Sequence, residues 1–281
     1  MAGKSSNNGN WASNSPATRY KASGKNREFY TFENAPGLGA YATGGTIIDG
    51  GDGYIYHIFT GDGTFAVNRP SAAIDSVDYL VVAGGGAITP GTAGASGGGG
   101  GGGFRFGNTT VSIGPYAISI GAGGPSVANS PAPAGTQRNG SPSTAFGLTA
   151  TGGGSGGNSP PGTFGRPGGS GGGGAFPNGT GGSGNTPATI PRQGYPGATP
   201  SGAASGGGGA GGVGVAGGPT SLLVGRGGFG RIAPEFPSTI VRQAIPAPLL
   251  PSWEPLVGSG GYAAGGAGTD PGGLVPAPPA A

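Results

Sequence analysis

Short runs of alternating apolar and polar residues predict β-strands in this chain. In segment 54–59, YIYHIF, successive side chains alternate between the two faces of a strand. Asp62-Gly63 is a favoured hairpin turn, and the apolar run 64–67 follows it. We therefore expect 54–59 and 64–67 to pair as a hairpin. Three more strands, each bounded by glycine-rich sequence, are expected at 77–82, 116–120 and 146–150.

Long glycine tracts separate these runs and raise the question of whether the chain between the strands is ordered. Glycine contributes 73 and proline 28 of 281 residues. The combined share of these two residues exceeds the roughly 25–30% at which composition alone predicts disorder. Aromatic residues nevertheless punctuate the tracts, whereas disordered segments have few of them. Helix is nearly excluded because glycine and proline both oppose it, and tract 206–218, GGGGAGGVGVAGG, breaks the three-residue register that collagen needs.

The conformation that remains is the extended polyproline-II helix adopted by glycine itself. Such a helix cannot satisfy its own backbone N–H and C=O groups, so several must lie side by side and bond to one another. Glycine allows that close approach, and the seven glycines 97–103 would span roughly 22 Å at about 3.1 Å per residue. We expect an all-β chain with almost no α-helix, in which a β-sandwich carries an inserted polyglycine-II lattice.

The same residues resemble a known family. GGTIIDGGDGYIYHIFTGDGTFAV (44–67) followed by VDYLVVAGGG (77–86), with GGGGFRF (100–106), YAISIGAGG (116–124), STAFGLTATGGGSGG (143–157) and tract 206–218, is similar to the glycine-rich domain of bacteriophage tail and other virion proteins. The resemblance covers roughly residues 44–230 and leaves 231–281 outside the shared pattern. No receptor-contacting loop of the related adhesins can be matched onto this chain.

The resemblance implies a fold, a location and a class of function. The expected fold is a jelly-roll or TNF-like β-sandwich with polyglycine-II helices, as in the tail-fibre-tip adhesins of some T-even-like phages and, more remotely, the glycine-rich extracellular module of anaplastic lymphoma kinase. The expected location is the virion, with no enzyme activity and no cofactor. We expect three parts: an extended basic arm at 1–43, the glycine-rich domain at 44–232, and a proline-rich strap at 233–281.

The N-terminal arm is the most basic part of the chain. Residues 1–28 hold five basic side chains against one glutamate, and they contain no apolar run long enough for a secretory signal or a membrane span. This arm is either a solvated tail or a basic arm that docks on an acidic protein surface. Nucleic acid is an unlikely partner because five charges without a folded motif attract phosphate only weakly. The basic residues proposed to anchor the chain to the virion are Arg19, Lys21, Lys25 and Arg27.

The C-terminal strap combines prolines with branched aliphatic residues and a tryptophan between 233 and 257. Proline at this density favours an extended strand with little entropy to lose, and the apolar side chains give it area to bury. The strap packs either on its own domain or on a neighbouring subunit. The strap residues proposed for virion anchoring are Leu249, Leu250 and Trp253.

Residues suited to catalysis or metal binding are scarce. The chain has no cysteine, and His57 is interpreted as a packed, hydrogen-bonded histidine on a strand face. The match of 212–217 to G-x-G-x-x-G follows no βαβ strand and is expected by chance. Turn 49–53, DGGDG, lacks the bidentate glutamate of a calcium loop, so no metal site is predicted.

The arginines between the two flanks have no acidic neighbours. From Asp78 to Glu235 no acidic residue occurs, and the charged residues are six arginines: Arg105, Arg138, Arg166, Arg192, Arg226 and Arg231. They either cap carbonyl groups and stack on aromatic rings, or form an exposed surface for anionic glycan or phosphate. The residues proposed for that surface are Arg138, Phe164, Arg166, Phe176, Arg192 and Tyr195.

Two functions follow from these expectations. The first is a non-enzymatic virion structural protein, an accessory, decoration or tail-associated subunit that contacts other capsid or tail subunits. The second is a tail-fibre adhesin that recognises a host-surface glycan or protein. A free disordered spacer is disfavoured by the strands and aromatic residues. Ordering so much glycine costs about 1–2 kcal/mol per residue in backbone entropy, so we expect a homo-oligomer.

Overall fold

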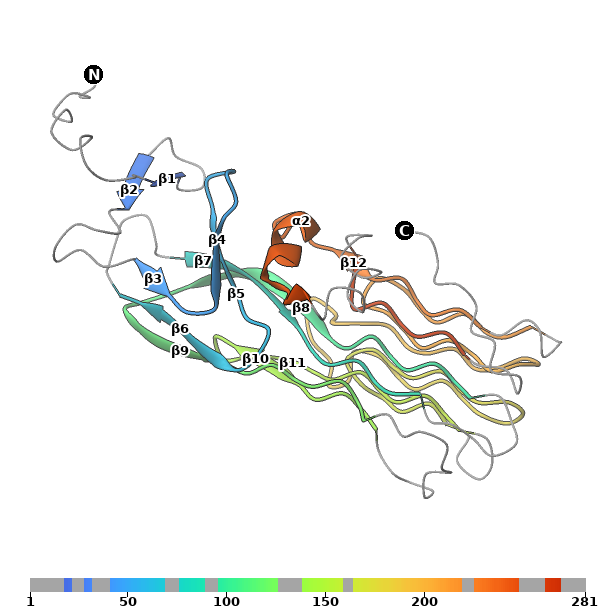
Figure 1. The fold of residues 1–281 in the computed structure, drawn as a ribbon. Coiled ribbons are helices and arrows are strands. Elements are labelled where there is room, and N and C mark those ends of the chain that lie inside the picture. Colours follow the sequence, from blue (N-terminus) through green and yellow to red (C-terminus); the bar gives the residue numbers. More distant parts are fainter. Residues whose placement is uncertain are drawn as a thin grey trace, which may run out of the picture.

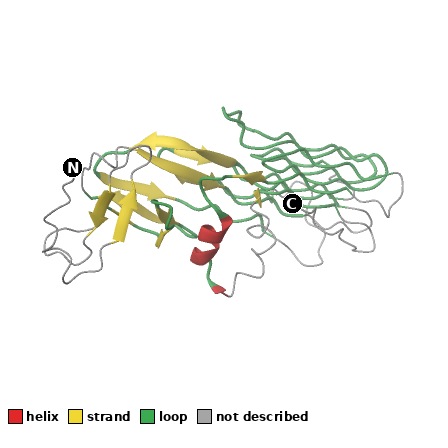
Figure 2. Cartoon of the chain, turned by 90° about the horizontal axis from the view of Figure 1, so that it is seen from above, coloured by secondary structure: helices red, strands yellow, loops and turns green. Residues whose placement is uncertain are grey.

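The computed structural model divides the chain between strands at one end and extended glycine segments at the other. It describes residues 41–68, 76–88, 96–125, 138–158, 164–218, 225–247 and 261–268, together with the backbone of two short strands at 18–21 and 28–31. Seen from above, the strands occupy one half of the molecule, and extended loop segments run side by side away from them (Figure 2).

Among the described residues, all strand pairs are antiparallel and belong to small sheets, as expected for an all-β chain. Five of these sheets have two strands, and one has three. The two-stranded pairs are β1 (Thr18–Lys21) with β2 (Glu28–Thr31), β4 (Thr46–Asp49) with β5 (Ile55–Ile58), β7 (Ser76–Val82) with β8 (Phe104–Thr110), β10 (Ser143–Ala145) with β11 (Leu148–Ala150), and β12 (Arg231–Ile232) with β13 (Gly261–Tyr262).

The three-stranded sheet has the order β3-β6-β9, from β3 (Ala42–Thr43), β6 (Gly63–Val67) and β9 (Gly114–Ile118). Within the described residues, helix is confined to one short stretch formed by α2 (Ser238–Val241) and the 3-10 turn η1 (Arg242–Ala244). The expectation of almost no helix is therefore confirmed for this part of the chain.

The hairpin expected between 54–59 and 64–67 is wrong. Strand β5 pairs instead with the preceding β4, and β6 pairs with β3 and β9. The earlier acidic turn closes the β4–β5 hairpin: Gly51 and Gly53 take positive φ there, and Gly51 N donates to Asp49 Oδ1 at 2.9 Å. Asp62 is used differently, because its Oδ1 accepts from Ile120 N at 2.7 Å beyond β9.

The remaining strand predictions differ in outcome. The strand expected at 77–82 is confirmed as β7, and that at 116–120 overlaps β9. The single strand expected at 146–150 is wrong, because Phe146 and Gly147 form the turn between β10 and β11 with φ of 53° and 73°. A two-residue turn with positive φ at both positions matches the twist of a hairpin.

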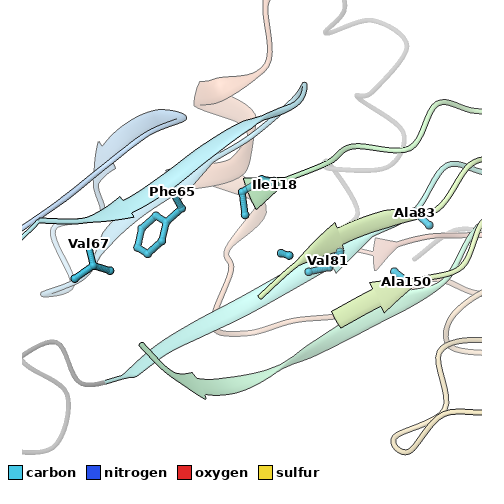
Figure 3. Close-up of a cluster of buried hydrophobic side chains, with 7 residues drawn as sticks. Phe65, Val67, Val81, Ala83, Ile118 and Ala150 are labelled. Atoms are coloured by element: carbon cyan, nitrogen blue, oxygen red, sulfur yellow. The ribbon is translucent and has the colours of Figure 1, made fainter. Parts of the chain in front are cut away.

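A hydrophobic core lies between the β3-β6-β9 sheet and strands β7, β10 and β11 (Figure 3). Phe65, Val67 and Ile118 face Val81 and Ala150 across this core, and the turn residue at 146 also packs against it. The aromatic ring at 146 lies 5.8 Å from that of Phe65, centroid to centroid, in an edge-to-face arrangement. Packing of this half-buried ring against the core explains why an aromatic residue is held at an unusual turn position.

Glycine segments at the other end bond to one another with a period of three residues. Along 97–103, every third N–H donates to segment 151–157 at 2.8–2.9 Å. The N–H groups of Gly98 and Gly101 donate instead to segment 205–208. The carbonyl oxygens of 97–103 accept hydrogen bonds from several further segments. Segment 97–103 is therefore hydrogen-bonded to neighbours on all sides. Three residues per turn is the geometry of polyproline II, and the bonding along 97–103 has the three-residue period that the predicted lattice requires.

The lattice needs glycine because its backbones approach one another closely. A Cβ at Gly100 would lie closer than 3.0 Å to the carbonyl oxygen of Ser170, and one at Gly101 closer than 3.0 Å to that of Ala263. Consecutive glycines thus face different neighbouring segments. The positions that carry serine or alanine inside the lattice, such as Ser205 and Ala204, are fully buried.

A second core joins the lattice to the strands. Phe104, Ala233 and Tyr262 belong to it, and Tyr262 Oη donates to the carbonyl of Phe236 at 2.8 Å. Ile245 is also buried, so the described part of the strap, 233–247, packs on its own domain. Segment 261–268 enters the lattice, since Gly266 N donates to Gly99 O at 2.8 Å. The boundary expected at 232 therefore divides segments that pack together.

Candidate functional site

Few of the residues proposed for virion anchoring lie in the part of the chain that the structure describes. Arg19 and Lys21 lie in β1, which pairs with β2, and only their backbone is described. The other proposed anchoring residues lie outside the described residues: Lys25, Arg27, Leu249, Leu250 and Trp253. Their role stays a prediction.

Two of the six residues proposed for a glycan surface come together at the far end of the lattice. Phe164 and Phe176 are 58% and 39% exposed. Gly165 N, next to Phe164, donates to Thr180 O at 2.8 Å, and the turn at 176–178 leads directly into that segment. Thr199 lies beside them, because its Oγ1 accepts from Gly181 N at 3.1 Å. We call Phe164, Phe176, Thr180 and Thr199 the end surface.

The register of the glycine segments shows that the end surface faces away from the strands. Segment 97–103 runs toward β8, which begins at Phe104, so residue 97 is at its far end. Gly97 lies against Gly173, and the chain continues past Gly173 to the turn at 176–178. The segments run outward together in Figure 1. All four residues of the end surface are exposed, two as aromatic rings and two as hydroxyls.

Arg192 and Tyr195 lie at the opposite end of the lattice. The Arg192 guanidinium stacks over the Tyr195 ring at 4.4 Å from its centroid. The next residue, Gln193, accepts from Phe104 N at 2.8 Å where β8 begins. Seven residues separate Arg192 from Thr199, or about 22 Å at 3.1 Å per residue. The six proposed residues therefore do not form a single surface.

Arg138 and Arg166 take two further positions. Arg138 is 3% exposed, so its guanidinium is not part of an exposed surface. Arg166 is half-buried, and its backbone N–H donates to Ser155 O at 2.9 Å inside the lattice. Arg231 shows the stacking expected as the alternative, since its guanidinium lies 4.8 Å from the Phe106 ring centroid and 5.6 Å from that of Phe104.

An ordered loop at 185–193 was not predicted. Asn185 Oδ1 accepts from Thr189 N and from Gln193 N, both at 3.1 Å. The fully buried Gln193 side chain accepts from Thr151 N at 2.8 Å and donates to Pro187 O at 2.9 Å. A glutamine between arginine and glycine carries no signal of burial, so sequence reasoning could not find this loop.

His57 is a packed residue, as predicted. Its Nδ1 lies 2.9 Å from Gly44 O, and its ring meets Phe65 edge to face at 5.0 Å. Burial lowers the pKa of His57 below its ordinary value, while the hydrogen bond to the Gly44 carbonyl has a smaller effect in the other direction. The imidazole is therefore neutral at physiological pH, with Nδ1–H donating to Gly44 O.

The acidic turn at 49–53 uses its carboxylates within the turn. Asp52 Oδ2 accepts from Tyr56 Oη at 2.7 Å, and Asp52 Oδ1 accepts from Tyr54 N at 3.0 Å. Burial and the neighbouring Asp52 raise the pKa of the Tyr56 hydroxyl. Among the described residues, no group of three histidine, aspartate or glutamate side chains is placed to hold a metal ion.

Comparison with known proteins identifies the domain. A family model of the glycine-rich domain matches residues 59–277, which is most of the chain. The match continues past 231, so the expectation that 231–281 lies outside the shared pattern is wrong for most of that segment. No curated protein matches the chain, and no solved structure does. A search of the described helices finds none with the length and apolar character of a membrane span.

Proposed function

Since this chain belongs to the glycine-rich domain family, we propose that it is a non-enzymatic structural protein of a bacteriophage virion. In this proposal it is a surface-exposed accessory, decoration or tail-associated subunit. The phage location follows from the resemblance of 44–67 and 77–86 to glycine-rich domains of virion proteins. The observation that carries the structural role is the three-residue bonding period of the lattice.

A lattice bonded in this way suits a rigid projection. Segment 97–103 is bonded on every side through its backbone, so its order depends on few side chains. The joint formed by Phe104, Ala233 and Tyr262 fixes the lattice to the strands. We propose that the strands form a jelly-roll sandwich near the particle, that the terminal arms contact capsid or tail subunits, and that the lattice points outward.

One observation favours an adhesin as the second candidate. The end surface exposes two aromatic rings, Phe164 and Phe176, beside two threonine hydroxyls at the end farthest from the strands. Aromatic faces bind apolar faces of ligands while nearby hydroxyls give directed hydrogen bonds. In this alternative the end surface contacts a glycan or protein on the host cell.

Quantitative mass spectrometry of purified particles tests the proposed function. The copy number of this chain is measured against the major capsid protein. Hundreds of copies per particle support a capsid decoration protein, and a few to a few dozen support a tail-associated subunit. Absence of the chain from particles purified to constant composition overturns the proposal.

A competition experiment separates the adhesin from the purely structural subunit. The purified chain is added to host cells before the phage, and phage adsorption is counted. An adhesin lowers adsorption, and the F164S/F176S variant loses this effect while the control V213S, at an exposed residue outside the end surface, keeps it. Adsorption that the wild-type chain leaves unchanged rules out the adhesin and leaves the structural role standing.

A further inference from the structure

The guanidinium of Arg138 is buried where the backbone of this residue joins the lattice. Arg138 is 3% exposed, and within the part of the chain that the structure describes its Nη1 atom is buried without a hydrogen-bond partner. Arginine stays protonated in proteins, so the guanidinium cannot avoid the cost of burying a charge by losing its proton. A full positive charge is therefore held out of contact with bulk water.

The backbone around Arg138 is fixed. Its carbonyl oxygen accepts from Ala87 N at 3.0 Å. The next residue, Asn139, accepts from Ser155 N at 2.9 Å and donates to Pro167 O at 3.3 Å. Moving the guanidinium into solvent by shifting this segment would break bonds to three others. The side chain thus starts from a rigid position.

Three of the described carboxylates hydrogen-bond to groups other than Arg138. Asp52 and Asp62 bond to the β4–β5 turn and to Ile120, and Asp78 Oδ1 accepts from Asn108 Nδ2 at 2.8 Å. Between Asp78 and Glu235 the sequence itself contains no acidic residue. Burial of an unpaired ion is strongly unfavourable unless a counter-charge and hydrogen bonds compensate it.

We propose that Arg138 forms a binding site for a small monovalent anion, of halide or formate size. One anion neutralises the single charge of the guanidinium, whereas a phosphate dianion would leave a buried negative charge in place of the positive one. The planar guanidinium offers hydrogen-bond donors that suit such an ion. Occupancy of this site makes the stability of the lattice depend on the anions in the medium.

Thermal unfolding of the full chain tests this site. The midpoint of unfolding is measured in sodium bromide and in sodium gluconate, whose anion is larger than the halide or formate proposed for the site, at one constant ionic strength. For the wild type, the midpoint rises by about 3–5 °C for each tenfold increase in bromide above its Kd. R138M shows no such rise, because methionine fills similar space without a charge. The control R166M, at a half-buried arginine of the same lattice, keeps the rise.

Crystals grown in bromide provide a second readout that does not depend on a variant folding. An anomalous bromide peak within hydrogen-bonding distance of Arg138 Nη1 supports the proposal. A water molecule at that position, or bromide dependence of the same size in wild type and R138M, overturns it. Neither result bears on the virion role, because that role is measured by the copy number of the chain in particles.

Discussion

Glycine at position 100 illustrates how single residues determine the lattice. Its missing side chain leaves room for the Ser170 carbonyl, and a Cβ there would come closer than 3.0 Å. Gly123 differs, because a Cβ at this exposed position would meet only Gly85 O, at 3.8 Å. The two glycines have the same chemistry and different surroundings, so they form a matched pair.

We predict that Gly100→Val lowers the free energy of unfolding by more than about 2 kcal/mol, because overpacking is joined by lost backbone hydrogen bonds. Gly123→Val lowers it by less than about 1 kcal/mol, within the usual range for surface positions. Urea unfolding of both variants measures the difference. Equal stability of the two variants would show that the segments around Gly100 are not closely packed.

The pKa of His57 leads to a prediction about pH. Burial holds the folded-state pKa below the ordinary value of 6.5, so the unfolded chain binds a proton at higher pH than the folded one. The stabilising contribution of neutral His57 is complete above pH 6.5 and is lost as the pH falls below it. The Gly44 hydrogen bond keeps the neutral ring in place.

We therefore expect the free energy of unfolding to decrease between pH 7.5 and pH 5.5, where aspartates and glutamates remain ionised. His57→Gln removes most of this decrease, although it lowers stability at pH 7.5. Urea unfolding at several pH values provides the measurement. An unchanged slope in His57→Gln would assign the pH dependence to other groups.

At the scale of elements, the loop at 185–193 is held by one buried glutamine. Gln193 joins Thr151 N to Pro187 O, and leucine of similar volume would leave both groups unpaired. Each buried unpaired group costs about 1–3 kcal/mol. The matched control is Gln243, an exposed glutamine whose Nε2 donates to Thr239 O at 3.1 Å.

We predict that Gln193→Leu lowers the free energy of unfolding by about 2–5 kcal/mol and that Gln243→Leu changes it by less than about 0.5 kcal/mol. Chemical denaturation of the two variants gives the comparison. Similar values for both would show that the bonds of Gln193 add nothing to stability.

Sequence patterns predict some elements and miss others for identifiable reasons. Segment 77–82, VDYLVV, is rich in valine and contains a tyrosine, and it forms β7. The partner of 54–59 was misassigned because two Asp-Gly turns flank it and local propensity does not choose between them. The turn at Phe146 was missed because aromatic residues seldom adopt positive φ, and a tertiary contact with Phe65 holds it there.

The candidate site was predictable only in part. Exposed aromatic residues in glycine tracts indicated a surface, and Phe164 and Phe176 are exposed beside backbone segments that bond to each other. Arg192 and Tyr195 stack on each other at the other end, because the register between segments decides which residues meet. Composition predicts that a lattice forms, whereas this register comes from the turns. The burial of Arg138 likewise has no local signal.

At the scale of the whole molecule, backbone bonding takes the place of a large hydrophobic core. The part of the chain that the structure describes has one core between the sheets and one where the lattice joins the strands. Beyond them, the glycine segments extend outward with mainly glycine, alanine and serine inside (Figure 1). Ordering these residues is entropically costly, so cooperation among many hydrogen bonds must hold the lattice, and an oligomer would add to it.

Amide hydrogen exchange, resolved by residue, tests most directly whether the lattice exists. We expect protection factors above about 10³ for Gly98, Gly100, Gly101 and Gly154, whose N–H groups donate to neighbouring segments at 2.8–3.0 Å. The exposed Gly61, outside the lattice, exchanges at nearly the rate of an unstructured peptide. Rapid exchange throughout 97–103 and 152–157 would contradict a bonded lattice and, with it, the rigid projection proposed for the virion.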